Sequence, residues 1–189
     1  MIEFVPSIIL ISMELNFCRR CGAPLTKKNG HVYTCERGHT IFLNPVPTVG
    51  VFLFDTSDNL LLSVRAIEPD KGALDAFGGF VDGDETFEQA LERELHEELG
   101  LTSSDYSKPV YLTSAVNQYR YGGEPITVIS NLYYARLKPS AQPKARDDVA
   151  EIHKITLNDV RLDMIGGDDI RRGLLVLKEL FAPEAKSQV

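Results

Sequence analysis

The sequence predicts an α/β protein, an α/β/α sandwich with a mixed sheet, preceded by a small cysteine-bearing segment. Three observations support this prediction. Strand-like and helix-like segments mix after residue 45, one amphipathic helix stands out between them, and all three cysteines fall between positions 18 and 35. Strands and helices in such an order typically fold into a sheet covered by helices. We expect three parts, formed by residues 1–12, 13–44 and 45–189.

The composition is that of an ordinary globular protein. Of the 189 residues, 43% are hydrophobic and 25% are charged, and the formal net charge is −7. This length allows one domain, or one domain with a small satellite. A chain with this charge carries no long basic track, so we do not expect nucleic acid as a partner.

The first apolar stretch, Val5–Ile11, is too short for a membrane span, which needs roughly 20 apolar residues. Glu3 precedes it and no basic residue opens it, unlike a secretory signal. Two interpretations of residues 1–12 stay open: a native start, or a non-native or disordered extension ahead of a native start at Met13. We expect a cytoplasmic protein with no membrane contact.

The strands are expected where apolar runs are bounded by turn residues. Val49–Phe54 reads as a buried strand, and Leu60–Arg65 reads as its partner across a turn. Glycines at positions 122 and 123 separate two longer candidates. The remaining expected elements are strands at 110–119, 126–137 and 151–155, and a last helix at 168–181.

The clearest element is a helix with a defined start and stop. Thr86 and Gln89 have the spacing of a capping box, and Gly100 lies where a helix usually ends. At about 100° per residue, the apolar side chains form one broad arc. The members of this arc are Phe87, Ala90, Leu91, Leu95 and Leu99.

Three glutamates of this helix do not fit a solvated polar face, which is the common interpretation of a glutamate-rich helix. Glu94 and Glu98 fall inside the apolar arc, and Glu97 lies at its edge. Their spacing brings the three carboxylates to one patch, where they repel each other. A divalent cation removes this repulsion, and Mg²⁺ or Mn²⁺ prefers oxygen ligands. The helix therefore indicates a metal site.

Gly79, Glu85 and the run Arg93–Leu101 together resemble a complete Nudix box, with every fixed position filled at the right spacing. The resemblance covers residues 45 to about 181 and implies the Nudix α/β/α sandwich. It also implies a hydrolase that cuts a diphosphate linkage with Mg²⁺ or Mn²⁺. The three helix glutamates would bind the metal, with the Gly79 carbonyl as a further ligand.

The resemblance assigns further roles. Glu85 and Arg93 would brace the loop against the helix, a role sometimes extended to catalysis. The carboxylate that accepts the proton of the attacking water stays open between Glu98 and Glu151. The alternative for Glu151 is an ordinary exposed residue. Arg65 could clamp a phosphate with two hydrogen bonds, or form a surface salt bridge instead.

The cysteines suggest zinc. Cys18 and Cys21 bracket a tight turn, and Cys35 and His39 follow, which together make a Cys₃His set of the structural type. The alternative is three free cysteines and a stray histidine. The segment resembles the zinc ribbon ahead of the Nudix domain in NADH pyrophosphatases. Those ribbons usually carry four cysteines, and His39 replaces the fourth here.

The substrate is less constrained than the chemistry. Tyr119, Tyr121 and Tyr133 could stack on a base, although strand aromatics more often pack in the core. The chain has no tryptophan and lacks the Ser-Gln-Pro-Trp motif of NADH pyrophosphatases. We expect a nucleoside diphosphate derivative, such as ADP-ribose or a dinucleotide like NADH or FAD. The alternatives are a nucleic-acid-binding or regulatory protein on the same scaffold, and an RNA cap-removing hydrolase. Many relatives are homodimers, so a homodimer is one expected assembly.

Overall fold

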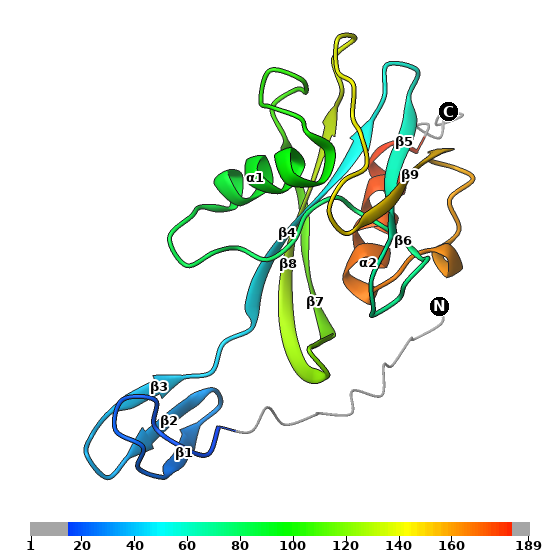
Figure 1. Ribbon diagram of the computed structural model, residues 1–189. Coiled ribbons are helices and arrows are strands. Elements are labelled where there is room, and N and C mark those ends of the chain that lie inside the picture. The colour runs from blue at the N-terminus through cyan, green and yellow to red at the C-terminus, as the bar shows by residue number, and fades with distance from the viewer. Residues whose placement is uncertain (1–14, 183–189) are drawn as a thin grey trace, which may run out of the picture. The chain divides into compact units, whose positions relative to one another are not determined.

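A computed structural model of the chain describes residues 15–182 (Figure 1). The expectations for residues 1–12 and for a native start at Met13 lie outside the described residues. The chain divides into two compact units. Among the described residues, one unit contains 15–45 together with 120–126, and the other contains 46–119 and 127–182.

The smaller unit contains a three-stranded antiparallel sheet, which the sequence did not predict in detail. Its strands, in sheet order, are β1 (Leu25–Asn29), β2 (Val32–Cys35) and β3 (Thr40–Phe42). The buried residues that hold it together are few: Cys18, Ala23, Cys35 and Ile41. A core of this size needs additional stabilisation, such as a structural metal.

The larger unit is built on a six-stranded sheet in the order β6-β5-β4-β8-β7, with β9 paired to β5. Strand β4 is parallel to β8 and antiparallel to β5, so the sheet is mixed, as predicted. The strand bounds are β4 (Val46–Phe54), β5 (Asn59–Arg65), β6 (Leu74–Asp75), β7 (Val110–Tyr121), β8 (Glu124–Arg136) and β9 (Val149–Thr156).

Two hydrophobic cores lie on opposite faces of this sheet because side chains alternate along a strand. In β4, Val51 and Leu53 face one core, which includes the buried side of α1 (Phe87–Leu99). The intervening Phe52 faces the other core, which includes the buried side of α2 (Asp168–Leu180). Figure 1 shows the two helices on either side of the strands. The predicted α/β/α sandwich is confirmed.

Helix α1 begins and ends as predicted. Thr86 Oγ1 accepts a hydrogen bond from the Gln89 backbone N–H at 3.3 Å, and the Gln89 side chain accepts from the Thr86 N–H at 2.8 Å. Gly100 ends the helix with a φ of 69°, a left-handed conformation that suits glycine. The buried residues of α1 are Ala90, Leu91, Leu95, Glu98 and Leu99. Glu98 therefore lies on the buried face, as its place in the predicted apolar arc indicated.

Helix α2 packs very closely against the sheet. A Cβ at Gly173 would lie 2.4 Å from Leu132 of β8, so only glycine fits this contact. In the first turn of α2, the buried Asp169 accepts a hydrogen bond from Ser130 of β8. Within residues 15–182, the structure contains no helix that is both long and apolar enough to span a membrane.

Candidate active site

The glycine pair before α1 lies directly beside two glutamates of that helix. Gly78 has a φ of 139°, and a Cβ there would lie 2.2 Å from the Val49 carbonyl oxygen. Its backbone N–H donates to Glu98 Oε2 at 2.8 Å. A Cβ at Gly79 would lie 2.6 Å from Glu94 Oε1. The Gly79 carbonyl accepts the Val49 N–H at 2.9 Å, which leaves one of its lone pairs for another partner.

Arg93 braces the loop and the helix together. Its guanidinium donates to both oxygens of Glu85, at 2.6 and 3.1 Å, and to the Phe80 carbonyl at 2.9 Å. It also donates to Glu94 at 2.7 Å and to Glu97 at 3.1 Å. These hydrogen bonds, that to Glu85 foremost, raise the pKa of Arg93. The arrangement is the brace that the resemblance implied for Glu85 and Arg93.

Glu98 is buried, with only 5% of its surface exposed. Burial raises the pKa of its carboxyl to about 9, and the nearby charges of Asp148, Glu94 and Asp75 act in the same direction. The hydrogen bond from Gly78 opposes this shift but does not cancel it. Burial also raises the pKa of Glu94. Without a cation, this cluster holds at least one proton in neutral solution.

Asp148 joins the helix glutamates from a distant part of the chain. Its loop is tied to the end of α1, because Lys144 N–H donates to the Leu99 carbonyl at 3.0 Å and Arg146 N–H donates to the Glu98 carbonyl at 2.9 Å. Asp148 lines the cavity beside the glycine pair. Asp148 was not predicted from the sequence, because its position depends on how its loop docks on α1.

Glu151, the other candidate base, lies three residues further along. It is exposed on β9, opposite Val64 of β5, and it does not line the cavities that the described residues form beside the glycine pair. Glu97 is also turned outward, with 46% of its side chain exposed. The charges of Glu94 and Asp148 thus act on the buried Glu98, whereas Glu97 lies at the rim.

Arg65 forms a half-buried ion pair rather than a surface salt bridge. It contacts Asp75 at 2.7 Å, the Tyr119 hydroxyl at 3.2 Å and the Pro69 carbonyl at 2.7 Å. Burial raises the pKa of Asp75 to about 6, although the charge of Arg65 opposes this shift. Each nitrogen of the Arg65 guanidinium already has a partner, and the group closes one side of the cavity.

The three tyrosines lie in three different environments. Tyr119 lines the cavity, and its ring lies edge to face with Phe80 at 5.9 Å between centroids. Tyr133 is buried in the core that contains α1. Tyr121 is 64% exposed and does not line the cavities formed by the described residues. Of the three, Tyr119 is placed where it could contact a ligand.

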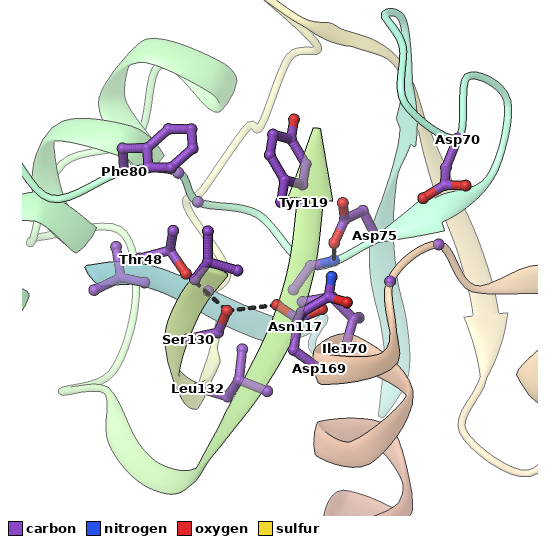
Figure 2. A pocket seen from close by; sticks show the side chains of 18 of the residues that line it. Thr48, Asp70, Asp75, Phe80, Asn117, Tyr119, Ser130, Leu132, Asp169 and Ile170 are labelled. Carbon is purple, nitrogen blue, oxygen red and sulfur yellow. Dashed lines mark hydrogen bonds between the residues drawn. The ribbon is translucent and has the colours of Figure 1, made fainter. Parts of the chain in front are cut away.

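Several cavity residues were not singled out from the sequence. Figure 2 shows them gathered from β4, β7, β8 and the first turn of α2. They include Thr48, Phe80, Asn117, Ser130 and Asp169. Phe80 directly follows the glycine pair, but the other four come from different elements and belong to no local motif, so no spacing in the sequence could have connected them.

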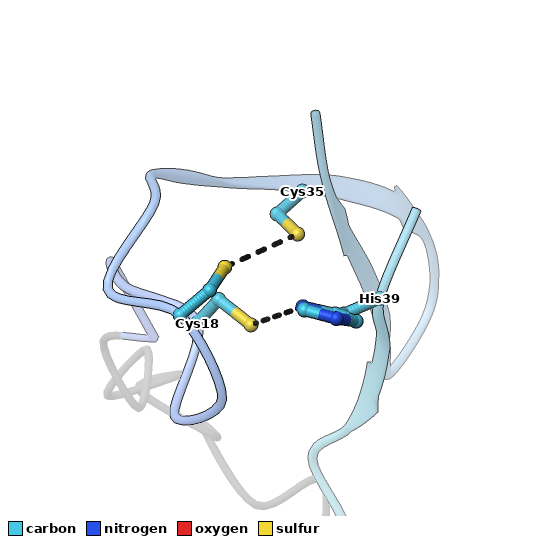
Figure 3. A group of neighbouring side chains, drawn as sticks. Cys18, Cys35 and His39 are labelled. Carbon is cyan, nitrogen blue, oxygen red and sulfur yellow. Dashed lines mark hydrogen bonds between the residues drawn. The ribbon is translucent and has the colours of Figure 1, made fainter. Parts of the chain in front are cut away.

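The second cluster lies in the smaller unit. The ligand atoms of Cys18, Cys21, Cys35 and His39 all lie within 4.8 Å of one another. Figure 3 shows Cys18 Sγ facing His39 Nδ1, 3.5 Å apart. Burial alone would raise the pKa of Cys18, but hydrogen bonds from Arg20, His39 and Cys21 outweigh it and lower the pKa to about 6. The cysteines are free thiols, and a thiolate is the metal-binding form.

A mixed sheet between helices, with acidic residues braced by arginine beside a glycine loop, defines the class as an α/β protein with an acidic site at one helix. The sequence profile of the NUDIX domain family matches residues 44–173, which is more than half of the chain. The chain therefore belongs to the NUDIX domain family.

Two curated relatives are informative. The human mitochondrial NAD(P)H pyrophosphatase NUDT13 is 36% identical over 87 residues, covering 45% of this chain and 24% of that protein. The NAD-capped RNA hydrolase NudC of Mycobacterium bovis is 29% identical over 136 residues, covering 69% of this chain and 39% of that protein. The chain thus aligns with well under half of the length of either relative.

Solved structures show the same fold. A NUDIX hydrolase from Nitrosomonas europaea superposes with a TM-score of 0.63 at 19% identity, covering 89% of this chain and 94% of that chain. The NUDIX domain of Shewanella oneidensis NrtR, solved in complex with ADP ribose, superposes with a TM-score of 0.57 at 25% identity. That match covers 74% of this chain and 90% of that chain.

The buried carboxyl of Glu98 predicts an unusual stability profile. In magnesium-free buffer the folded protein keeps the Glu98 proton up to about pH 9, whereas the unfolded chain loses it at its ordinary, lower pKa. The folded state therefore binds more protons between these values, and its stability falls as the pH rises. Glu98→Gln should melt at a higher temperature than the parent at pH 8, with the difference shrinking toward pH 5.

The exposed Glu92→Gln on the same helix is the matched control and should change the melting temperature little at either pH. Thermal unfolding followed by circular dichroism measures all three proteins. A Glu98→Gln variant that melts below the parent at both pH values would contradict the buried, proton-holding state of Glu98.

The cysteine cluster predicts one bound zinc. Protein purified without chelator should contain about one zinc per chain, as expected for a closed tetrahedral site. His39→Ala should lower this content and the melting temperature of the smaller unit, because one of four ligands is lost. His31→Ala is the control, since His31 is exposed in the same unit and lies outside the cluster. Elemental analysis showing no zinc in the intact protein would leave the cluster as free thiols.

Proposed function

We propose that this chain is a metal-dependent pyrophosphohydrolase that cuts the diphosphate bridge of a nucleoside diphosphate derivative. One observation carries the proposal: Glu98 is buried on a helix, and the charges of Glu94 and Asp148 act on it together with its burial to raise its pKa. Such burial of mutually repelling carboxylates is costly for folding alone. Such an arrangement is useful where a divalent cation is to be bound next to a diphosphate.

The donor set fits a hard cation. Glu94, Glu98 and Asp148 offer carboxylate oxygens, and the Gly79 carbonyl keeps a free lone pair. We assign these groups as ligands of Mg²⁺ or Mn²⁺, with Glu97 at the rim. When bound, the metal would neutralise charge on the diphosphate and make the attacking water more acidic.

Residues of the chain itself would orient the carboxylates and accept the proton of the attacking water. Gly78 N–H holds Glu98 Oε2, which fixes the carboxylate toward the cavity. Arg93 keeps Glu94 in place from the other side. Glu98 and Asp148 are the two carboxylates placed to accept the proton from the attacking water. Arg93 and Glu85 act as positioning residues, because they brace the loop that carries the glycines.

ADP-ribose is the substrate we favour. The NrtR domain of similar fold binds ADP ribose, and the human relative is named an NAD(P)H pyrophosphatase. Both compounds contain the same linkage, an adenosine diphosphate esterified to a second sugar. Tyr119 lines the cavity and can contact a sugar or a base.

A second candidate is removal of an NAD cap from RNA, since the mycobacterial relative is named an NAD-capped RNA hydrolase. The bond cleaved would be the same one. The net charge of −7 disfavours a long RNA track, because phosphate contacts require cationic side chains. We therefore rank the small-molecule substrate first.

For the smaller unit we propose a structural zinc ion held by Cys18, Cys21, Cys35 and His39. Four ligands from the protein close a tetrahedral site and leave no position for a substrate. Free thiols of this kind suit a reducing compartment such as the cytoplasm.

Hydrolysis should fall within the phosphate bridge. ADP-ribose is expected to yield AMP and ribose 5-phosphate, and a dinucleotide is expected to yield two monophosphates. EDTA should abolish the reaction, and Mg²⁺ or Mn²⁺ should restore it. Reaction in oxygen-18 water, followed by mass spectrometry, should place the label on one product phosphate. Release of free nicotinamide or free adenine would instead mean glycosidic cleavage and would refute the proposal.

Two variants distinguish the carboxylates outside the helix. Asp148→Asn should lower kcat by about tenfold or more, because it removes a ligand or proton acceptor from the cavity. Glu151→Gln should lower it far less, since Glu151 is exposed and outside the cavity lining. Steady-state kinetics with ADP-ribose and Mg²⁺ compares them. An equal or larger loss in Glu151→Gln would transfer the role to Glu151.

A further inference from the structure

One end of the cavity contains a buried chain of hydrogen bonds that the proposed reaction does not use. Thr48 of β4, Ser130 of β8 and Asp169 of α2 meet there, as the dashed lines in Figure 2 show. Ser130 is 2% exposed and Asp169 is 6% exposed. Burying a carboxylate is costly unless it is well satisfied. We call these three residues the cavity floor.

The direction of these hydrogen bonds decides what the floor can bind. A carboxylate only accepts, so Ser130 Oγ gives its single proton to Asp169 Oδ2. Ser130 Oγ in turn accepts from Thr48 Oγ1 at 2.7 Å. Both hydroxyl protons are used within the floor. It therefore offers acceptor lone pairs to a ligand and no O–H donor.

The surrounding polar groups add an N–H donor, the Asn117 amide, beside the acceptor Asp169. A Cβ at Gly167 would lie 2.6 Å from Asp169 Oδ1 and 3.2 Å from Asn117 Nδ2, so both side chains border the same small space. Arg65 is held by Asp75 and the Tyr119 hydroxyl and is not directed at the floor. An anionic group would meet no counter-charge here, whereas a neutral group with N–H donors would find acceptors.

Two aromatic rings in the cavity lining offer a surface on which a flat ligand can pack. Phe80 and Tyr119 line the cavity, with an angle of 77° between their rings, and Figure 2 shows them on the side away from Ser130 and Asp169. A planar base can pack against such rings while its edge reaches the polar floor.

We propose that the floor binds the exocyclic amino group of a purine base, and that Asp169 makes the site prefer an amino purine to hypoxanthine. This inference rests on the proposed function, because it places the diphosphate toward Glu98 and Asp148 and the base at the opposite end. It adds the chemical class of the base, which the carboxylate cluster alone does not define.

Binding of mononucleotides tests the inference without any hydrolysis. Isothermal titration of the intact protein with AMP, GMP and IMP, in the presence of Mg²⁺, compares two amino purines with IMP. IMP has a carbonyl in place of the adenine amino group and a hydrogen in place of the guanine amino group. AMP or GMP should bind at least about tenfold more tightly than IMP, since IMP leaves the buried acceptor without an amino donor. Affinities of all three within about twofold would overturn the inference.

A variant assigns the preference to Asp169. In Asp169→Asn the side chain gains an N–H donor, so the preference for ADP-ribose over inosine diphosphate ribose in kcat/KM should vanish or reverse. Asp168→Asn is the matched control, because Asp168 is exposed in the same helical turn and pairs with Arg171 at 2.7 Å. An Asp169→Asn variant that is folded by circular dichroism and keeps the full preference would overturn the assignment.

The two proposals fail in different ways. Hydrolysis of ADP-ribose and of the inosine compound at equal rates would refute base selection and leave the pyrophosphohydrolase intact. Selective binding of AMP or GMP without hydrolysis of any diphosphate would refute the pyrophosphohydrolase and leave base selection intact. Should Asp169→Asn fail to fold, the nucleotide comparison on the parent protein decides the question.

Discussion

The electrostatic repulsion among Glu98, Glu94 and Asp148 is the constraint on which the rest of the site depends. A buried carboxylate with two such neighbours cannot ionise freely, and the pKa of Glu98 rises to about 9 as a result. The fold keeps this arrangement by surrounding it with fixed donors. Gly78 N–H reaches Glu98, and Arg93 reaches Glu94. Removing either donor would take a hydrogen bond away from a carboxylate. The glycine loop and the arginine are therefore needed to keep these acidic residues in place.

This constraint also explains why the backbone is so tightly packed around α1. Gly78 and Gly79 lie where a side chain would collide with the Val49 carbonyl or with Glu94. The loop that carries Asp148 is held by backbone hydrogen bonds to the last turn of α1. The helix α1, the glycine loop and the Asp148 loop are therefore joined to one another by hydrogen bonds from backbone N–H groups, which hold the main chain around the carboxylates in place.

The parts of the site that lie on one continuous segment could be predicted from the sequence. The wheel placed Glu98 on a buried face, the capping residues marked the ends of α1, and the Cys₃His spacing indicated a cluster whose ligand atoms the structure brings together. Contributions from distant segments could not be predicted. Asp148 depends on how its loop docks on α1, and Ser130 depends on the pairing of β8 with β4. The periodicity of apolar residues indicates which face of a helix or strand a residue occupies. It does not indicate which other strand lies beside that residue.

The proposed site has two parts with different chemistry. The carboxylates of α1 and of the Asp148 loop would suit a cation and the phosphates that accompany it, and they would repel a bare anion. The floor at β4, β8 and α2 suits a neutral donor, because its hydroxyl protons are already committed to Asp169. Under the proposed function, the substrate carries its diphosphate and its recognition group at opposite ends. A nucleoside diphosphate has this arrangement, with a ribose between its charged and its neutral part.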